Sequence, residues 1–274
     1  MPIYMDRHNT EGATREECAA SHEKDLATQG KYGVRFLTYW FDEVRSKAFC
    51  LVDAPNKDAL QKAHDEAHGG VANEIIEVDP AVVEAFLGRV TDPPPTGSGD
   101  RAQLDSAFRA IMFTDLKDST AMTTRLGDLK PLDLLHIHNS LTRHALRQHT
   151  GREVKHLGDG IMASFASIDQ SLECAVAIQR AFAAYNVQNS GAPLHLRIGL
   201  SVGEPVESDN DLFGRTVQLA SRVCAHAEPD QILATEDVVA QFAGERSLFL
   251  TRGPITPKGF DHAIQVYEVR WCDD

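Results

Sequence analysis

The sequence is poor in cysteine, with five residues at positions 18, 50, 174, 224 and 272 and no CxxC pair. A small, odd and scattered set argues against a disulfide framework or a thiolate zinc site. Long hydrophobic runs are also missing, because nowhere do 18 uncharged apolar residues follow one another. Met1–Gly12 has no basic stretch leading into an apolar one. We therefore expect no membrane span, no signal peptide and a cytoplasmic location.

Basic residues are in short supply, with 27 Lys and Arg against 40 Asp and Glu and a formal charge of −13. This balance argues against nucleic acid or a membrane surface as a partner, so any anionic ligand must be held by local groups. The apolar share of 42% and charged share of 24% are those of a globular protein. A length of 274 residues predicts two domains.

A linker is predicted where three prolines and a Gly-Ser-Gly sequence follow one another, in Thr91–Asp100. Proline can neither continue a helix nor donate to a sheet, and the glycines are flexible. We place the linker at 89–104, between an N-terminal domain at 1–88 and a C-terminal domain at 105–274.

The N-terminal domain shows an alternation of strands and helices in the order βαββαβ. This order predicts an α+β fold of the ferredoxin-like kind, with helices on one face of the sheet and an open second face. An open apolar face favours dimerisation. The expected strands are 2–5, 34–40, 49–52 and 74–78, and the expected helices are 14–28 and 55–68.

Five segments of this domain resemble the small nickel-binding protein family, catalogued also as a domain of unknown function. The resemblance covers nearly all of residues 1–80 and implies a dimeric α+β barrel that binds nickel. The segments are MDRH at 5–8, AASHEKDL at 19–26, YGVRFLTYWFD at 32–42, FCLVDAPN at 49–56 and AHDEAHGGVANEIIEV at 63–78.

The residues themselves point to a metal through one pair. His64 and His68 are four apart and share a helical face, so that two imidazoles can meet one ion. Imidazole with carboxylate suits nickel, copper or zinc. The alternative is a set of exposed helix histidines and a buried strand cysteine. The other candidate ligands are His8, His22, Asp6 and Cys50.

Two carboxylates stand out in the C-terminal domain. Phe108–Phe113 is an apolar strand that leads into Asp115 and then into a predicted helix start. Farther on, Glu153–Leu157 and Ile161–Phe165 are predicted strands joined by a tight turn with Asp159 at its tip. An aspartate at either kind of place is commonly a cap or a turn former.

Four motifs in this domain occur in a fixed order and together resemble the class III nucleotidyl cyclase catalytic domain. The resemblance spans 108–242 and continues more weakly to Val269. It implies an α/β sandwich and catalysis with two divalent ions, Mg²⁺ or Mn²⁺, held by carboxylates. The motifs are FTDLKDST at 113–120, VKHLGDGIMASF at 154–165, LRIGLSVGE at 196–204 and DLFGRTVQLASRV at 211–223.

The resemblance implies how metal and phosphate are held. Asp115 and Asp159 match the family's metal-binding aspartates, and the carbonyl of Leu116 adds a ligand. The amides around Ser119 and Thr120 face the β- and γ-phosphates.

It also implies how the nucleoside and the transition state are recognised. Lys155 and Asp211 match the positions that read the purine edge, and this pair suits adenine; the alternative is a solvated strand charge and a loop residue. Arg222 matches the arginine that stabilises charge on the transferring phosphate. Gln218 stands where the family has asparagine, and its extra methylene predicts reduced activity. Lys258 matches a phosphate-contacting lysine.

In this family the metal aspartates and the purine-reading residues belong to opposite subunits. The sequence is therefore interpreted as a homodimeric adenylate cyclase that converts ATP to 3′,5′-cyclic AMP and pyrophosphate, with an N-terminal metal- or ligand-responsive domain. One alternative is a weakened relative that binds nucleotide as a regulatory module. Another is a metal-binding protein whose N-terminal domain carries the function.

Overall fold

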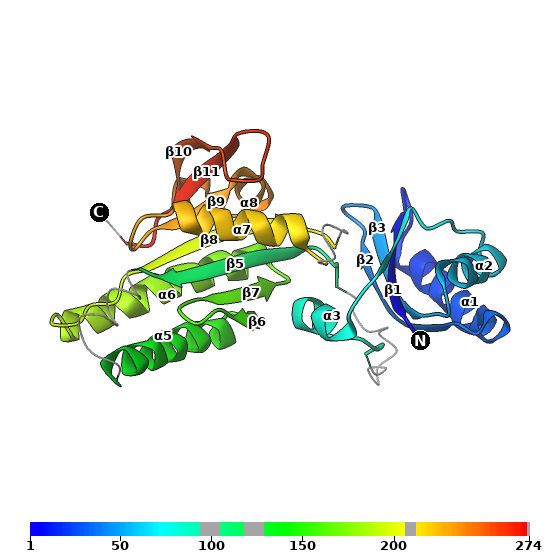
Figure 1. The fold of residues 1–274 in the computed structure, drawn as a ribbon. Coiled ribbons are helices and arrows are strands. Elements are labelled where there is room, and N and C mark those ends of the chain that lie inside the picture. Colours follow the sequence, from blue (N-terminus) through cyan, green and yellow to red (C-terminus); the bar gives the residue numbers. More distant parts are fainter. Residues whose placement is uncertain (94–104, 118–128, 206–211, 273–274) are drawn as a thin grey trace. The chain divides into compact units, whose positions relative to one another are not determined.

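The computed structural model of the chain describes residues 1–93, 105–117, 129–205 and 212–272 (Figure 1). They form two compact units, one containing residues 1–108 and 205–212 and the other residues 109–204 and 213–274. Most of the predicted linker, 94–104, lies outside the described residues. Within the described residues, no helix is both long and apolar enough to cross a membrane.

The first unit has the predicted ferredoxin-like α+β fold, with one antiparallel sheet in the order β2-β3-β1-β4. Thr14 begins α1 by accepting a hydrogen bond from the Glu17 amide, and Asn56 begins α2 in the same way through Ala59. The elements are β1 Ile3–Asn9, α1 Arg15–Tyr32, β2 Arg35–Asp42, β3 Lys47–Asp53, α2 Lys57–Ala67, β4 Glu74–Glu77 and α3 Pro80–Leu87.

One face of this sheet packs against α1 and α2 (Figure 1). Side chains alternate between faces along a strand, so Asp6 on β1 and its register partner Cys50 on β3 both point to the helical side. They enter a core that includes Tyr4, Phe36, Tyr39, Val52 and Leu60. Two polar ligand candidates are thereby placed inside an apolar layer.

The second face is covered, which corrects the prediction of an open face. Pro80–Leu87 forms α3, capped by Asp79, and this helix lies on the side of the sheet opposite α1 and α2 (Figure 1). Met5, Trp40 and Leu51 point to this second face and are at most 1% exposed. This face is therefore not an exposed apolar surface that would favour dimerisation.

The second unit is built on a seven-stranded sheet in the order β10-β11-β9-β8-β5-β7-β6. All neighbouring pairs are antiparallel except β8 and β9, which are parallel. Its strands are β5 Arg109–Leu116, β6 Arg152–His156, β7 Ile161–Phe165, β8 Leu196–Gly203, β9 Ile232–Thr235, β10 Phe249–Ile255 and β11 Ile264–Val269. Its helices are α5 Leu129–Gln148, α6 Ile168–Gln188, α7 Gly214–His226 and α8 Glu236–Gln241, with a short 3₁₀ helix at Arg246–Leu248.

A glycine lets α7 lie directly on the sheet. A Cβ atom at Gly199 on β8 would stand 2.2 Å from the Cys224 backbone nitrogen and 2.5 Å from the Ala220 carbonyl oxygen. The backbone of α7 is therefore in contact with the strand that neighbours β5. This close approach fixes which residues of α7 face the end of β5.

Candidate active site and candidate metal centre

The two aspartates expected to hold metal come together in the second unit. Asp115 lies near the end of β5 and Asp159 lies in the β6–β7 turn, and the Leu116 amide donates to the Asp159 carbonyl at 2.9 Å. Gly160 permits this approach, because a Cβ there would stand 2.1 Å from the Thr114 carbonyl oxygen. Both aspartates line a cavity of about 140 Å³, together with Phe113, Thr114, Leu157, Gly160, Arg197, Ser221, Cys224 and Ala225.

Arg197 is a residue of this cavity that the sequence reasoning missed. Asp115 on β5 and Arg197 on β8 are register partners, and the Arg197 Nε donates to Asp115 Oδ2 at 2.6 Å. A second guanidinium nitrogen donates to the Ala225 carbonyl at 2.9 Å. The arginine thus joins β5, β8 and α7 at the cavity and supplies a positive charge beside the carboxylate. The sequence feature that could have indicated Arg197 is its position in the motif LRIGLSVGE.

The residues expected to act on the phosphate and the ribose lie elsewhere in the same chain. Gln218 and Arg222 are exposed on α7, and neither is among the residues that line the aspartate cavity, to which this helix contributes Ser221, Cys224 and Ala225. One copy of the chain therefore does not bring Gln218 and Arg222 into the aspartate cavity.

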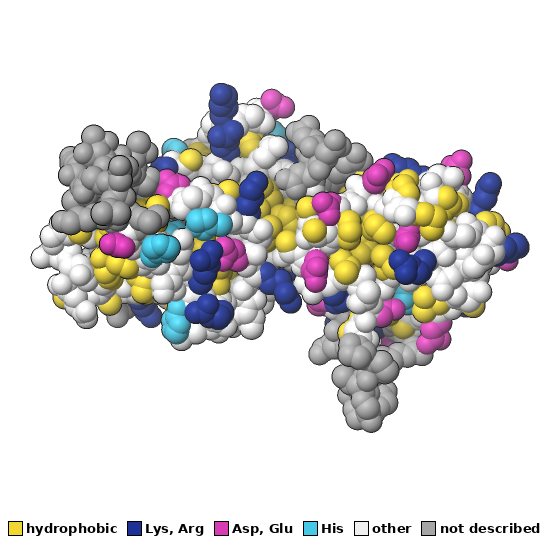
Figure 2. Space-filling model, turned by 60° about the horizontal axis from the view of Figure 1, so that its bottom comes forward, with side chains coloured by type: hydrophobic (Ala, Val, Ile, Leu, Met, Phe, Trp, Pro, Cys, Tyr) yellow, Lys and Arg dark blue, Asp and Glu magenta, His cyan; other side chains and the backbone are white. Residues whose placement is uncertain are grey.

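The remaining candidates of this unit are exposed or lie outside the described residues. Lys155 is exposed on β6, and Lys258 is exposed between β10 and β11. Figure 2 shows that histidine and basic side chains gather on the face of the molecule where α5 and β6 lie. Ser119, Thr120 and Asp211 lie outside the described residues.

The donor chemistry of the aspartate cavity fits hard divalent ions. Carboxylate and carbonyl oxygens are the ligands that Mg²⁺ and Mn²⁺ prefer. The cavity offers two carboxylates, and Asp115 keeps its second oxygen, Oδ1, outside the bond from Arg197. Leu116 has a hydrocarbon side chain without a donor atom, so only its backbone carbonyl is suited to a ligand role.

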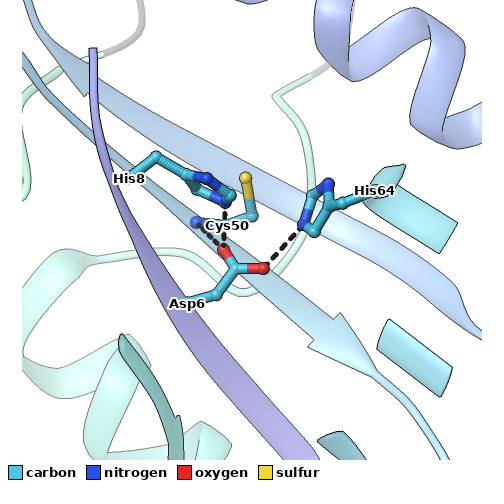
Figure 3. A group of neighbouring side chains, drawn as sticks. All are labelled: Asp6, His8, Cys50 and His64. Carbon is cyan, nitrogen blue, oxygen red and sulfur yellow. Dashed lines mark hydrogen bonds and ion pairs between the residues drawn. The ribbon is translucent and has the colours of Figure 1, made fainter. Parts of the chain in front are cut away.

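A second cluster of ligand-type side chains is buried in the first unit, where Asp6, His8, Cys50 and His64 meet (Figure 3). One ligand atom from each lies within 4.8 Å of all the others. His64 Nε2 is 2.7 Å from Asp6 Oδ2, and the Cys50 amide donates to Asp6 Oδ1 at 3.1 Å. His8 Nε2 is 3.3 Å from Asp6 Oδ1 but makes no hydrogen bond in the described residues.

The other ring nitrogen of His64 faces a further group that includes Asp25, another residue missed by the sequence reasoning. His64 Nδ1 is 3.0 Å from Asp25 Oδ1 and 3.2 Å from His68 Nε2, and His68 Nε2 is 3.2 Å from the same Asp25 oxygen. The i, i+4 pair therefore converges as predicted from its spacing. The carboxylate comes from α1, which no local pattern indicated.

His22 does not join either group of ligand atoms. It lines the same cavity of about 230 Å³ as His8, His64 and His68. However, its Nε2 is 3.1 Å from Asp92 Oδ2, and its ring stacks against Tyr39 with centroids 4.5 Å apart. His22 thus contacts the segment that follows α3 and lies outside both groups of ligand atoms, and its role as a ligand stays a prediction.

The charges of the buried cluster are set by its hydrogen bonds. Burial opposes a charged imidazole, but bonds to Asp25 and Asp6 raise the pKa of His64 to about 10. Burial also opposes a charged Asp6, yet the nearby His8 and His64 hold the pKa of its carboxyl well below the ordinary value. Burial, followed by the charge of Asp6, raises the pKa of the Cys50 thiol well above its ordinary value. At neutral pH His64 is therefore an imidazolium between two carboxylates, and Cys50 is a thiol.

Comparison with known families agrees with this geometry. Residues 106–270 match the model described as the adenylate and guanylate cyclase catalytic domain. The chain belongs to this cyclase family. Residues 4–78 match the model described as nickel responsive protein SCO4226-like. Both resemblances inferred from the sequence motifs are confirmed by these matches.

Three similar proteins cover between 58% and 76% of the chain. An uncharacterized protein of Mycobacterium bovis is 32% identical over 165 residues, which are 58% of this chain and 40% of that protein. An adenylate cyclase of Mycosarcoma maydis is 31% identical over 232 residues, 76% of this chain but 8% of its own length. An adenylate/guanylate cyclase/hydrolase structure from Silicibacter pomeroyi has a TM-score of 0.51 at 26% identity and covers 59% of this chain and 95% of that one. The chain thus spans less than half the length of these two curated relatives.

Proposed function

We propose that this cyclase converts ATP to 3′,5′-cyclic AMP and pyrophosphate at sites shared by two copies of the chain. The observation that carries the proposal is the division of the candidate residues within one copy. Asp115 and Asp159 line one cavity, whereas Gln218 and Arg222 lie exposed on α7. A second copy whose α7 faces the cavity would complete the set, so a homodimer would hold two sites.

The chain's own residues divide the work as follows. Asp115 and Asp159 would hold Mg²⁺ or Mn²⁺, which neutralises triphosphate charge and activates the 3′-hydroxyl when bound. Arg197 positions the Asp115 carboxylate through its 2.6 Å bond and keeps that side chain at the cavity. Arg222 from the partner copy would stabilise the charge that develops on the α-phosphate. Lys258 would contact the phosphates.

Selection of the base rests on Lys155 and Asp211. A lysine donates to a ring nitrogen, and a carboxylate accepts from the 6-amino group of adenine. Guanine would present its O6 oxygen to that carboxylate, which is unfavourable for two acceptors. The exposed position of Lys155 on β6 leaves it accessible to a nucleotide bound against the partner copy.

The decisive experiment is to incubate the purified chain with ATP or GTP and with Mg²⁺ or Mn²⁺. We expect 3′,5′-cyclic AMP and pyrophosphate in equal amounts and at least ~10-fold less product from GTP, because one unfavourable polar contact costs more than ~1.4 kcal/mol. Product identity is checked by chromatography against standards. An Asp159→Ala variant controls for contaminating enzymes. Predominant cyclic GMP would contradict the base assignment, and equal product from the variant would contradict the site.

A second role is favoured by the buried histidine cluster of the first unit. We propose that this domain binds a transition metal, such as nickel, and that binding alters cyclase output. An ion that binds two arrangements of the dimer with equal affinity does not change their relative populations. Regulation therefore requires different affinities for the active and inactive arrangements.

Nickel added to the ATP assay tests this coupling. Wild-type output should change by at least ~5-fold, the lower end of ordinary allosteric coupling, and a Cys50→Ser variant should lose the response. The Cys18→Ser variant removes a thiol of the same cavity that lies outside both ligand groups, so it should respond like wild type. Equal output with and without nickel in the wild-type chain would separate metal binding from catalysis.

A further inference from the structure

The two ligand groups of the first unit differ in how completely the protein surrounds them. Asp6, His8, Cys50 and His64 come from β1, β3 and α2, and Asp6, Cys50 and His64 are at most 7% exposed. They offer one oxygen, two nitrogens and one sulfur. Four protein ligands of this kind form a closed tetrahedral site.

The second group offers three ligands around an open position. The contacting atoms of Asp25, His64 and His68 form a triangle with sides of 3.0, 3.2 and 3.2 Å. Ligands at ~2.1 Å from a tetrahedral ion stand roughly 3.4 Å apart, so a shift of a few tenths of an ångström admits the ion. The group borders the cavity of about 230 Å³, which leaves room for an exchangeable fourth ligand.

The proton positions in this triangle also favour an ion. If His64 Nδ1 and His68 Nε2 each donate to Asp25, then two N–H groups face each other across 3.2 Å. Two donors at that distance repel, whereas two nitrogen lone pairs directed at one cation attract it. In the first group the buried His8 Nε2 lies 3.3 Å from Asp6 Oδ1 without forming a hydrogen bond in the described residues, so its lone pair can also be directed at an ion.

His64 connects the two groups, because its ring nitrogens point in opposite directions. Nε2 faces Asp6 at 2.7 Å and Nδ1 faces Asp25 at 3.0 Å. We propose that the first unit holds two transition-metal ions at once, one in each group, with the His64 ring bridging them. This inference rests on the metal-binding role proposed above and specifies its sites.

The ligand atoms determine which protons leave when the two metal ions bind. A ring nitrogen binds an ion only without its hydrogen, so His64 gives up both N–H protons and His68 gives up the Nε2 proton that it directs at Asp25. Cys50 gives up its thiol proton. These protons pass to solvent, and no electron is transferred. The sulfur and nitrogen donors favour nickel, cobalt, copper or zinc over magnesium. The bridge makes the two positions dependent on one another.

The test is a nickel titration of the full chain by calorimetry, with bound metal counted after gel filtration. Asp115→Asn and Asp159→Asn are introduced throughout so that the cyclase cavity does not contribute. We expect two equivalents per chain. Cys50→Ser and His68→Gln should each remove about one equivalent, because each residue belongs to one group. Cys18→Ser should keep two. These substitutions are used instead of a His64 variant, because replacing His64 would leave the buried carboxylates of Asp6 and Asp25 unpaired.

Cobalt provides a readout that does not depend on counting. The chain that carries only Asp115→Asn and Asp159→Asn is the parent of the other variants. A thiolate-to-metal absorption band in the near ultraviolet should appear in this parent and in His68→Gln but not in Cys50→Ser. One equivalent in the parent would overturn the two-ion arrangement while leaving metal binding in place. No bound nickel would overturn both. Two equivalents retained by Cys50→Ser with a native circular dichroism spectrum would also overturn the assignment.

Discussion

Mixing an Asp115→Ala chain with an Arg222→Ala chain should restore the cyclase activity that each has lost. Alone, each homodimer should retain less than about 1% of wild-type activity, because losing a group that stabilises developing charge costs ~10²–10³ in rate. In an equal mixture half of the dimers are heterodimers with one intact site of two, which predicts recovery to about a quarter of wild-type activity. Cyclic AMP production by the re-equilibrated mixture measures the recovery.

The control for this experiment pairs two lesions of the same half-site. Asp115 and Asp159 line one cavity, so a heterodimer of Asp115→Ala with Asp159→Ala has a damaged aspartate pair in both sites. That mixture should stay inactive. If differently tagged Asp115→Ala and Arg222→Ala chains are shown to associate and activity does not return, the shared site is rejected.

The N-terminal fold could be predicted because its signals are local. Strand alternation, the caps at Thr14 and Asn56 and the glycine after α1 all act within a few residues. The helix α3 was missed although Asp79 and Pro80 are a start signal, because the strand at 74–78 was taken as the last element of the domain. Its burial depends on the apolar second face of the sheet, which is a tertiary property.

Residues of the candidate sites could be predicted only where they stand in a recognisable sequence motif. Asp115 and Asp159 stand in short motifs, and their meeting in one cavity follows from the hairpin. Arg197 and Asp25 were missed because their partners are 82 and 39 residues away, and strand register and helix packing decide such contacts. The contact of His22 with Asp92 was also not foreseen, since the two residues are 70 positions apart.

Replacing Gln218 by asparagine should raise kcat by up to ~100-fold, since a displacement of ~1 Å at a reacting group costs that much. Gln218 is exposed on α7, one helical turn before Arg222. Its amide reaches one methylene farther than the asparagine that the family places there. If this amide orients the ribose, the longer side chain holds the 3′-hydroxyl away from its line of attack.

The change should act on kcat rather than KM, because an orienting contact matters more in the transition state than in the bound substrate. The fold should tolerate it, since glutamine and asparagine differ by only a few tenths of a kcal/mol in an exposed helix. Gln188→Asn makes the same chemical change at an exposed position of α6 and should leave kcat unchanged. Steady-state rates over a range of ATP concentrations separate kcat from KM. A lower kcat in Gln218→Asn, with Gln188→Asn unaffected, would show that this site is built around the longer amide, so that the ribose sits farther from α7 than in relatives with asparagine.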